Sequence, residues 1–168
     1  MTHALITGGG GFIGLHLARR LLKAGVRVTL VDNFSRGARD GDLADLLRQD
    51  GAELRSGDLR DPETWRALPR DVTRVFHFAA ILGVRNVLER AFEVLGDNVA
   101  MAVRALAWAR TLPGLSRFVF ASTSEVYAGT LAAHGLAFPT PESTPLVASD
   151  LAHPRSSYML SKIQGEAL

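Results

Sequence analysis

The chain has 168 residues, of which 47% are hydrophobic and 21% are charged, and its formal net charge is +2. This length and composition predict one globular domain and exclude a disordered chain. The 19 basic and 17 acidic residues are scattered, so nothing indicates a nucleic-acid-binding surface. There is no cysteine, and the five histidines lack zinc-ligand spacing, so we expect no disulfide and no metal site.

The amino terminus lacks the basic and apolar regions of a secretory signal. No segment reaches the ~20 apolar residues that span a bilayer. We therefore expect a cytoplasmic protein that does not enter a membrane.

Short apolar runs alternate along the chain with segments of helical periodicity. Strands are predicted at 3–7, 27–31, 53–56, 74–79 and 117–121. Helices are predicted at 12–24, around 43–47, at 62–65, after the fourth strand, at 98–111 and at 158–168. The Pro-, Ser- and Thr-rich residues 129–157 are expected to form a loop. This alternation predicts an α/β fold with a doubly wound, Rossmann-like parallel sheet in the order 3-2-1-4-5 and helices on both faces.

Glycines at positions 8, 11 and 14 stand between the first predicted strand and the first predicted helix. In a dinucleotide-binding turn, Gly8 permits the tight turn, Gly11 lets backbone N–H groups approach a pyrophosphate, and Gly14 lets the helix pack on the strand. The helix N-terminus then attracts the anion. The alternative is a flexible glycine loop, which the flanking strand and helix disfavour.

Asp32 ends the second predicted strand, 18 residues after Gly14. This is the position of a carboxylate that binds the adenosine ribose hydroxyls. Its charge would repel a 2′-phosphate, which favours NAD over NADP, although Arg36 in the next loop could receive that phosphate. The alternative is an ordinary turn aspartate.

Tyr158 and Lys162 are four residues apart on the last predicted helix, so both side chains can face one pocket. A tyrosine with a pKa of ~10 is a poor base at neutral pH. The ammonium group, together with the positive charge of an oxidised nicotinamide, would stabilise the phenolate. The alternative is an exposed helix pair, which Asp32 and the glycine turn disfavour.

Seven motifs together resemble the extended short-chain dehydrogenase/reductases, and within them the NAD-dependent nucleotide-sugar epimerases and dehydratases. They occur in that family's order and are TGGGGFIG at 7–14, VDNFSRG at 31–37, GDLRD at 57–61, HFAA at 77–80, Asn98, STSEVY at 122–127 and YMLSK at 158–162. The resemblance spans nearly the whole chain.

This resemblance implies an NAD site. Its residues are Gly8, Gly11, Phe12, Ile13, Gly14, Asp32, Asn33, Asp58, Leu59, Ala79, Ala80, Asn98, Tyr158 and Lys162. Asp58 and Leu59 would border the adenine, Ala79 and Ala80 would line the phosphate and nicotinamide-ribose side, and Asn98 would steady the backbone of the site. Without the resemblance, Asp58 is a turn residue, the alanines pack at a strand end and Asn98 is a helix cap.

The resemblance also implies a catalytic set of Thr123, Glu125, Tyr158 and Lys162. Tyr158 would remove the C4 hydroxyl proton of a nucleotide sugar while hydride passes to NAD, giving a 4-keto sugar, and NAD would be regenerated in each cycle. Thr123 would hydrogen-bond the reacting oxygen at the carboxyl edge of the sheet. Glu125 is either a base at C5 or a surface carboxylate.

The step after C4 oxidation stays open. STSEVY is close to the pattern of UDP-glucuronate decarboxylases, whereas residues 77–98 resemble UDP-galactose 4-epimerases. The family carries a C-terminal substrate lobe, so we expect residues 1–168 to be a truncated NAD-binding domain with an exposed strand edge at 118–120. A homodimer at full length, a complementing C-terminal half, and a non-catalytic NAD-binding module are the further possibilities that follow.

Overall fold

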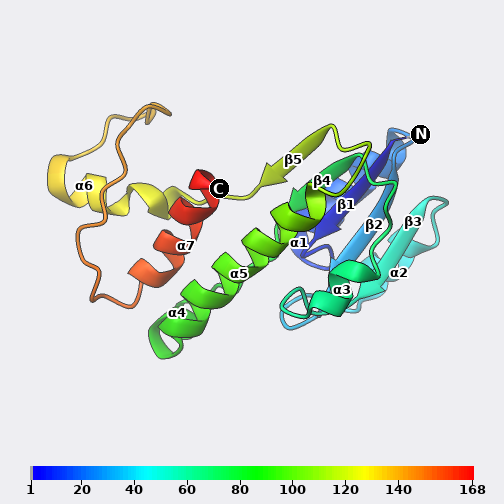
Figure 1. The fold of residues 1–168 in the computed structure, drawn as a ribbon, viewed down its shortest axis with the longest axis horizontal. Coiled ribbons are helices and arrows are strands. Elements are labelled where there is room, and N and C mark those ends of the chain that lie inside the picture. The colour runs from blue at the N-terminus through cyan, green and yellow to red at the C-terminus, as the bar shows by residue number, and fades with distance from the viewer. Residues whose placement is uncertain (1) are drawn as a thin grey trace. The chain divides into compact units, whose positions relative to one another are not determined.

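A computed structural model describes residues 2–168 (Figure 1). Their contacts divide the chain into two compact units. The first comprises the residues up to Ala80 together with Met101–Ala121, and the second comprises Ile81–Ala100 together with Ser122–Leu168. Helix α5 (Ala91–Ala109) contributes residues to both units.

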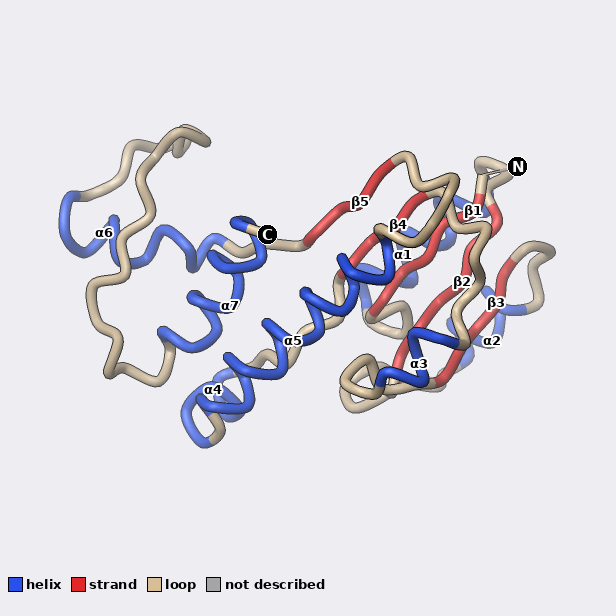
Figure 2. The backbone as a smooth tube through the Cα atoms, in the orientation of Figure 1, coloured by secondary structure: helices blue, strands red, loops and turns tan. Residues whose placement is uncertain are grey.

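The first unit is built on a five-stranded parallel sheet in the order β3-β2-β1-β4-β5 (Figure 2). The strands are β1 (His3–Thr7), β2 (Arg27–Asp32), β3 (Ala52–Ser56), β4 (Arg74–His77) and β5 (Arg117–Phe120). The predicted fold class and strand order are therefore confirmed. Strand β4 ends two residues earlier than the sequence indicates, because Phe78 and Ala79 turn their amide groups to the side chain of Thr7.

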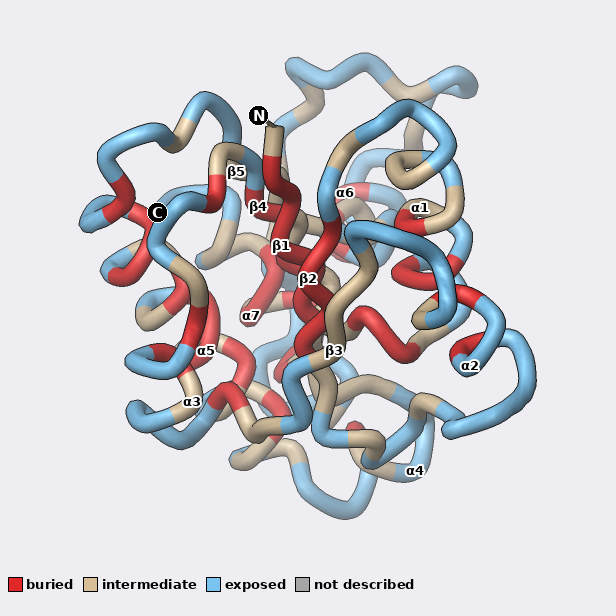
Figure 3. The backbone as a smooth tube through the Cα atoms, turned by 90° about the vertical axis from the view of Figure 1, so that its right-hand side faces the viewer, coloured by how far each residue is buried: buried red, intermediate tan, exposed pale blue. Residues whose placement is uncertain are grey.

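Helices cover both faces of this sheet, as Figure 3 shows for α1 and α2 on one side and α3 on the other. Their bounds are α1 (Phe12–Lys23), α2 (Gly41–Leu47) and α3 (Pro62–Arg66). On the first side, Ile6 and Leu30 of the strands pack with Leu15 of α1 and Leu46 of α2 in one buried cluster. Burial on both faces explains why these strands are nearly continuous apolar runs in the sequence.

Local sequence signals determine the helix ends. Gly25, with φ +73°, ends α1, and the Val26 amide donates to the carbonyl of Leu21. Asp40 caps α2 by accepting from the amide of Leu43 at 3.0 Å, and Asp61 caps α3 by accepting from the amide of Glu63 at 2.9 Å.

The second unit is helical. Besides the first part of α5, it contains α4 (Val84–Glu89), the 3-10 turn η1 (Ser124–Tyr127), α6 (Ala128–His134) and α7 (Ser156–Ala167). The predicted helix 98–111 begins earlier, at Ala91, because the apolar spacing continues upstream of Asn98. The predicted helix 158–168 begins at Ser156.

The prediction of an uninterrupted loop over 129–157 is wrong, since α6 occupies its first residues. The Pro- and Ser-rich composition belongs to the later residues, whereas 128–134 is rich in alanine, a strong helix former. Packing fixes this helix. A Cβ at Gly129 would lie 1.8 Å from the carbonyl oxygen of Val147, and the Thr130 hydroxyl donates to the carbonyl of Pro145 at 2.6 Å.

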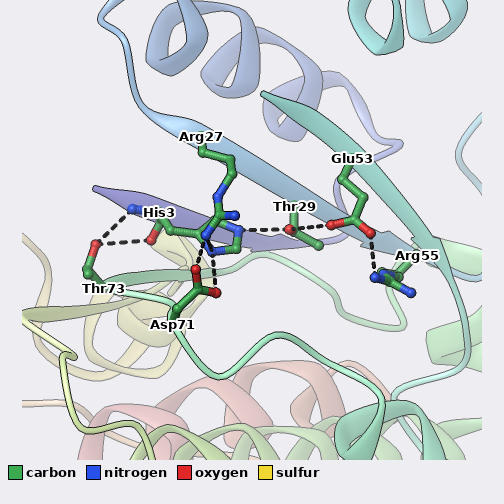
Figure 4. Close-up of polar contacts among 7 residues, drawn as sticks. All are labelled: His3, Arg27, Thr29, Glu53, Arg55, Asp71 and Thr73. Carbon is green, nitrogen blue, oxygen red and sulfur yellow. Dashed lines mark hydrogen bonds and ion pairs between the residues drawn. The ribbon is translucent and has the colours of Figure 1, made fainter. Parts of the chain in front are cut away.

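A polar network joins the amino ends of three strands (Figure 4). The buried imidazole of His3 contacts a carboxylate oxygen of Asp71 through Nδ1 at 3.0 Å and the hydroxyl of Thr29 through Nε2 at 2.8 Å. Thr29 in turn donates to Glu53 at 3.4 Å, and Arg27 pairs with Asp71. These groups lie toward the amino-terminal ends of the strands, whereas the glycine turn follows the carboxyl end of β1. They therefore connect strands and do not belong to the predicted cofactor site.

Candidate functional site

The glycine turn follows β1 in the first unit. Gly8 has φ +68°, and a Cβ there would lie 2.9 Å from the amide nitrogen of Ala79. A Cβ at Gly14 would lie 2.6 Å from the carbonyl oxygen of Gly8, so α1 reaches the turn only because position 14 has no side chain. At Gly11 the nearest atom to a Cβ is the Gly8 oxygen, at 3.3 Å. Gly8 and Gly14 thus shape the turn.

The N-terminus of α1 has the features of an anion site. Gly11 is its N-cap, no side chain caps it, and its first turn contains no acidic residue. The first amides of a helix have no partner within the helix, and the helix dipole favours an anion there. Phe12 and Ile13 are 77% and 65% exposed at this turn, so their side chains project outward.

Asp32 is tied directly to the glycine turn. Its Oδ2 accepts from the amide of Gly10 at 2.8 Å, and its Oδ1 accepts from the amide of Phe34 at 2.7 Å. The sequence indicated Asp32 but not these two partners, since Gly10 is an inner residue of a glycine run and Phe34 lies in a loop. The side chain of Asp32 therefore links the end of β2 to the turn after β1.

Asn33 and Asp58 meet beside this arrangement. The Asn33 amide donates to Asp58 Oδ2 at 3.1 Å, while Arg60 donates to the same carboxylate from Nε at 3.0 Å and from its terminal nitrogen at 2.7 Å. Chiefly through these side-chain hydrogen bonds, Arg60 holds the pKa of Asp58 well below its usual range. Leu59 is buried, and its carbonyl accepts from the Trp65 indole at 2.8 Å.

Ala79 and Ala80 follow β4. The Ala79 amide donates to the Thr7 hydroxyl oxygen at 3.2 Å, and that oxygen lies 2.8 Å from Nδ1 of buried His77. Thr7 thus holds the backbone of Ala79 against Gly8. Thr7 and His77 stand in the motifs TGGGGFIG and HFAA, but the sequence indicates no role for either side chain, because their contact joins residues 70 positions apart.

In the second unit, Asn98 holds a backbone segment. Its side chain accepts from the amide of Ile81 at 2.7 Å and donates to the carbonyl of Ile81 at 2.9 Å. Asn98 lies inside α5, which rules out the alternative of a helix cap. Its amide also lies 3.5 Å from the hydroxyl of Ser161 on α7, whose own proton is donated to the carbonyl of Tyr158.

Tyr158 and Lys162 share one side of α7, with Lys162 Nζ lying 5.7 Å from the centre of the Tyr158 ring. Lys162 is only 3% exposed, and burial lowers its pKa to about 8. Burial, with a smaller contribution from the charge of Glu125, raises the pKa of Tyr158. At neutral pH this pair holds a charged amine near a protonated phenol.

Thr123 and Glu125 lie at η1, which packs against α7. The Thr123 hydroxyl oxygen accepts from the amide of Glu125 at 3.3 Å, so its proton remains available to donate. Ser122 donates to Glu166 of α7, which links the start of η1 to that helix. The second unit therefore gathers Thr123, Glu125 and the Tyr158–Lys162 pair.

Residues 4–168 match the NAD dependent epimerase/dehydratase family. The chain belongs to this family. The resemblance that the seven motifs indicated is thereby confirmed, and so is the prediction of an NAD-dependent enzyme family.

Proteins named for different chemistries are similar to this chain. A UDP-N-acetyl-alpha-D-glucosaminuronate decarboxylase of Bacillus cytotoxicus is 38% identical over 73% of the chain and 37% of its own length. A D-erythronate dehydrogenase of Cupriavidus necator is 38% identical over 99% of the chain and 49% of its length. The UDP-glucose 4-epimerase of Bifidobacterium longum, solved with NAD+ and UDP, is 26% identical with a TM-score of 0.81 over 99% of this chain and 47% of that one.

The chain thus spans half or less of the length of these relatives. Within residues 2–168, no group of three or more His, Asp or Glu side chains is arranged to hold a metal ion. In the same residues, none of the helices combines the length and the apolar character that crossing a bilayer requires.

Proposed function

We propose that this chain binds NAD and supplies the cofactor-binding part of an enzyme that acts on a nucleotide sugar through transient oxidation at C4. The observation that carries the cofactor half of the proposal is the Asp32 carboxylate, which accepts the amide of Gly10 at 2.8 Å. That bond fixes a carboxylate beside a glycine turn whose helix N-terminus has no side-chain cap.

The residues present fit NAD. The amides at the start of α1 suit the pyrophosphate, and the absence of a side chain at Gly8 lets the turn after β1 pass close to the backbone of Ala79. Asp32 would accept the adenosine ribose hydroxyls, and its charge would oppose a 2′-phosphate, which favours NAD over NADP. Asn33, Asp58 and buried Leu59 would border the adenine. When bound, the cofactor supplies a hydride acceptor for C4.

The proposed catalytic residues lie in the second unit. Tyr158 would take the C4 hydroxyl proton, and Lys162 would stabilise the resulting phenolate. The hydroxyl proton of Thr123 would hydrogen-bond the reacting oxygen. Because burial raises the pKa of Tyr158, its activation depends on positive charge nearby, which Lys162 provides. The charge of Glu125 contributes to the raised pKa of Tyr158. Glu125 would serve as the base at C5.

Two further candidate functions have specific support. The decarboxylase relative favours decarboxylation after C4 oxidation, and the dehydrogenase relative, which aligns with 99% of the chain, favours net oxidation of a smaller hydroxy acid. The absorbance of NADH separates them. A dehydrogenase accumulates NADH with turnover, whereas an epimerase, dehydratase or decarboxylase that regenerates NAD in each cycle does not, and a non-catalytic module gives no turnover.

We also propose that the active enzyme contains a complementing C-terminal half and forms a homodimer. The chain covers 49% of the dehydrogenase relative, and β5, which carries apolar residues at 118–120, is the last strand of the sheet. An edge strand of this kind accepts a further strand. Turnover of a nucleotide sugar by a monomer of the 168-residue chain alone would contradict this proposal.

The first experiment is a calorimetric titration of the chain with NAD and with NADP. We expect NAD to bind more tightly than NADP. Asp32→Ala should weaken NAD binding by about 10- to 100-fold, because charge-assisted hydrogen bonds are lost. Asp45→Ala, which removes an exposed carboxylate of α2 paired with Arg48, is the matched control and should bind like the wild type. Absence of NAD binding, or equal binding of NAD by Asp32→Ala, would contradict the proposal.

A further inference from the structure

Phe34 has a strained backbone. Among residues 2–168 it is the one non-glycine residue with a positive φ, at 57°, a conformation that is unfavourable for an L-residue. Such strain persists only where the surrounding structure imposes it, and it is frequent at ligand sites. The amide of Phe34 donates to Asp32 Oδ1 at 2.7 Å, so this conformation aims an N–H group at the carboxylate.

The ring of Phe34 occupies the place of a side chain at Gly10. A Cβ at position 10 would lie 2.8 Å from Phe34 Cε1 and 3.2 Å from Asp32 Oδ2. The amide of Gly10 donates to this same Oδ2 at 2.8 Å, whereas the amide of Phe34 donates to Oδ1. Gly10, Asp32 and Phe34 therefore pack against one another, and the Phe34 ring fits in this place only because residue 10 has no side chain.

Arg39 holds the ring in place. Its guanidinium carbon lies 4.3 Å from the centre of the Phe34 ring, within cation–π distance, and it donates to the hydroxyl of Ser56 at 2.8 Å. Ser56 ends β3, so the ring is braced between the glycine turn and the edge of the sheet. A side chain added at Gly10 cannot simply push the ring aside without breaking this contact.

We propose that Phe34 is a positioning residue for recognition of the adenosine ribose, acting through the orientation of the Asp32 carboxylate. This inference rests on the proposed function, because it requires Asp32 to bind the ribose. A carboxylate offers about four lone-pair directions. The amides of Gly10 and Phe34 each occupy one lone-pair direction on one oxygen of Asp32. The remaining lone pairs are thereby held in a fixed orientation, which suits the two neighbouring hydroxyl groups of a ribose.

The test measures ribose recognition directly. The 168-residue chain is titrated with NAD, ADP and 2′-deoxy-ADP, and the melting temperature of each variant is recorded. The wild type is expected to prefer ADP to 2′-deoxy-ADP. Gly10→Ala should displace the ring, weaken NAD binding by about tenfold and bring the ratio of the two ADP affinities close to one. Phe34→Leu alone leaves a gap beside Gly10 and should also reduce the preference for ADP over 2′-deoxy-ADP.

The double variant is decisive. Gly10→Ala with Phe34→Leu replaces a small–large pair by a pair of similar total size, so it should recover most of the preference for ADP. Gly41→Ala is the control, because a Cβ at Gly41 meets no atom within 4 Å, and it should keep the wild-type ratio. A residue that merely stabilises the fold would change the melting temperature but not the ratio.

Three results would overturn the proposal. The first is a wild-type ADP ratio in both Gly10→Ala and Phe34→Leu, and the second is a double variant no better than Gly10→Ala. If Gly10→Ala does not fold, the ratio in Phe34→Leu alone decides. The third is a wild type that binds no NAD, in which case the proposed function fails as well. The first two results leave NAD binding by the wild type intact, so the failures are distinguishable.

Discussion

Nδ1 of His3 and a carboxylate oxygen of Asp71 lie 3.0 Å apart, while Nε2 of the same imidazole lies 2.8 Å from the hydroxyl of Thr29 (Figure 4). The imidazole is buried, whereas Asp71 is 60% exposed. A titratable core residue of β1 is thus in contact with two partly exposed charged groups, Asp71 and Arg27, whose terminal nitrogen lies 2.9 Å from the same Nδ1. The charges that act on the imidazole are those of Arg27, Asp71 and Glu53, and the contact of the imidazole with Thr29 joins β1 to β2.

The first prediction is that stability falls as the pH falls below about 7. Burial lowers the pKa of His3 from 6.5, an effect that Arg27 reinforces and that Asp71 and Glu53 oppose. The unfolded chain therefore takes up this proton first, which favours unfolding at lower pH by at most about 1.4 kcal/mol per pH unit. Asp71, whose pKa is lowered chiefly by its hydrogen bond to His3, acts only below about pH 4.

Urea unfolding of the wild type and of His3→Gln between pH 5 and 7.5 checks this prediction. The contribution of His3 is the difference between the two proteins in the slope of the unfolding free energy against pH. His3→Gln should therefore show a smaller slope than the wild type. His134→Gln, which removes an exposed histidine of α6, serves as the control. Equal slopes in the wild type and in His3→Gln would show that His3 does not titrate between the folded and unfolded states.

The second prediction concerns Gly14. A Cβ there would lie 2.6 Å from the Gly8 oxygen and 2.8 Å from the Gly9 Cα, which are backbone atoms of the turn. Gly14→Ala must therefore open the turn, and we expect it to cost about 1–3 kcal/mol of unfolding free energy. Gly41→Ala should change the stability by no more than about 0.5 kcal/mol. The fluorescence of Trp65 and Trp108 reports on this unit, and equal midpoints for both variants would refute the argument.

The sequence was sufficient for the sheet but not for the details of the site. Apolar runs separated by helical spacing predicted all five strands and their order, because buried parallel strands carry continuous apolar residues. Helix α6 differs from the predicted loop because its alanines directly precede Pro- and Ser-rich residues, whose composition dominates that part of the sequence. The link from Asp32 to Gly10 and Phe34 depends on one positive φ and on ring packing, which no short pattern encodes.

The third prediction is that Asn98 protects the backbone of Ile81. Its side chain provides a partner for both the amide and the carbonyl of that residue, at 2.7 and 2.9 Å. Asn98→Ala leaves both groups without this partner and should cost about 1–3 kcal/mol. Hydrogen exchange at the Ile81 amide should accelerate in this variant. In the control Asn86→Ala, which removes one bond to the Leu82 carbonyl, the Ile81 amide should keep its protection.

The fourth prediction is that Lys162 loses its proton near pH 8. Lys162 is buried, and burial is the cause that lowers its pKa to about 8 from the usual 10.5. Between these two values the unfolded chain binds the proton more tightly, so this group makes the unfolding free energy rise with pH from about 8 to 10.5. The chain has only two lysines, Lys23 and Lys162, so carbon-13 labelling of the side-chain methylene next to the amine gives two signals that can be followed separately.

Two variants separate burial from the neighbouring groups in this titration. Tyr158→Phe removes the hydroxyl but keeps the ring over which Nζ lies at 5.7 Å, so the Lys162 pKa should remain near 8. Glu125→Gln removes a charge that raises the pKa of Tyr158, so the tyrosine should titrate at lower pH than in the wild type. A Lys162 signal that titrates near 10.5 in the wild type would mean that the amine reaches solvent. α7 would then not hold it in the buried position from which it is proposed to stabilise a phenolate.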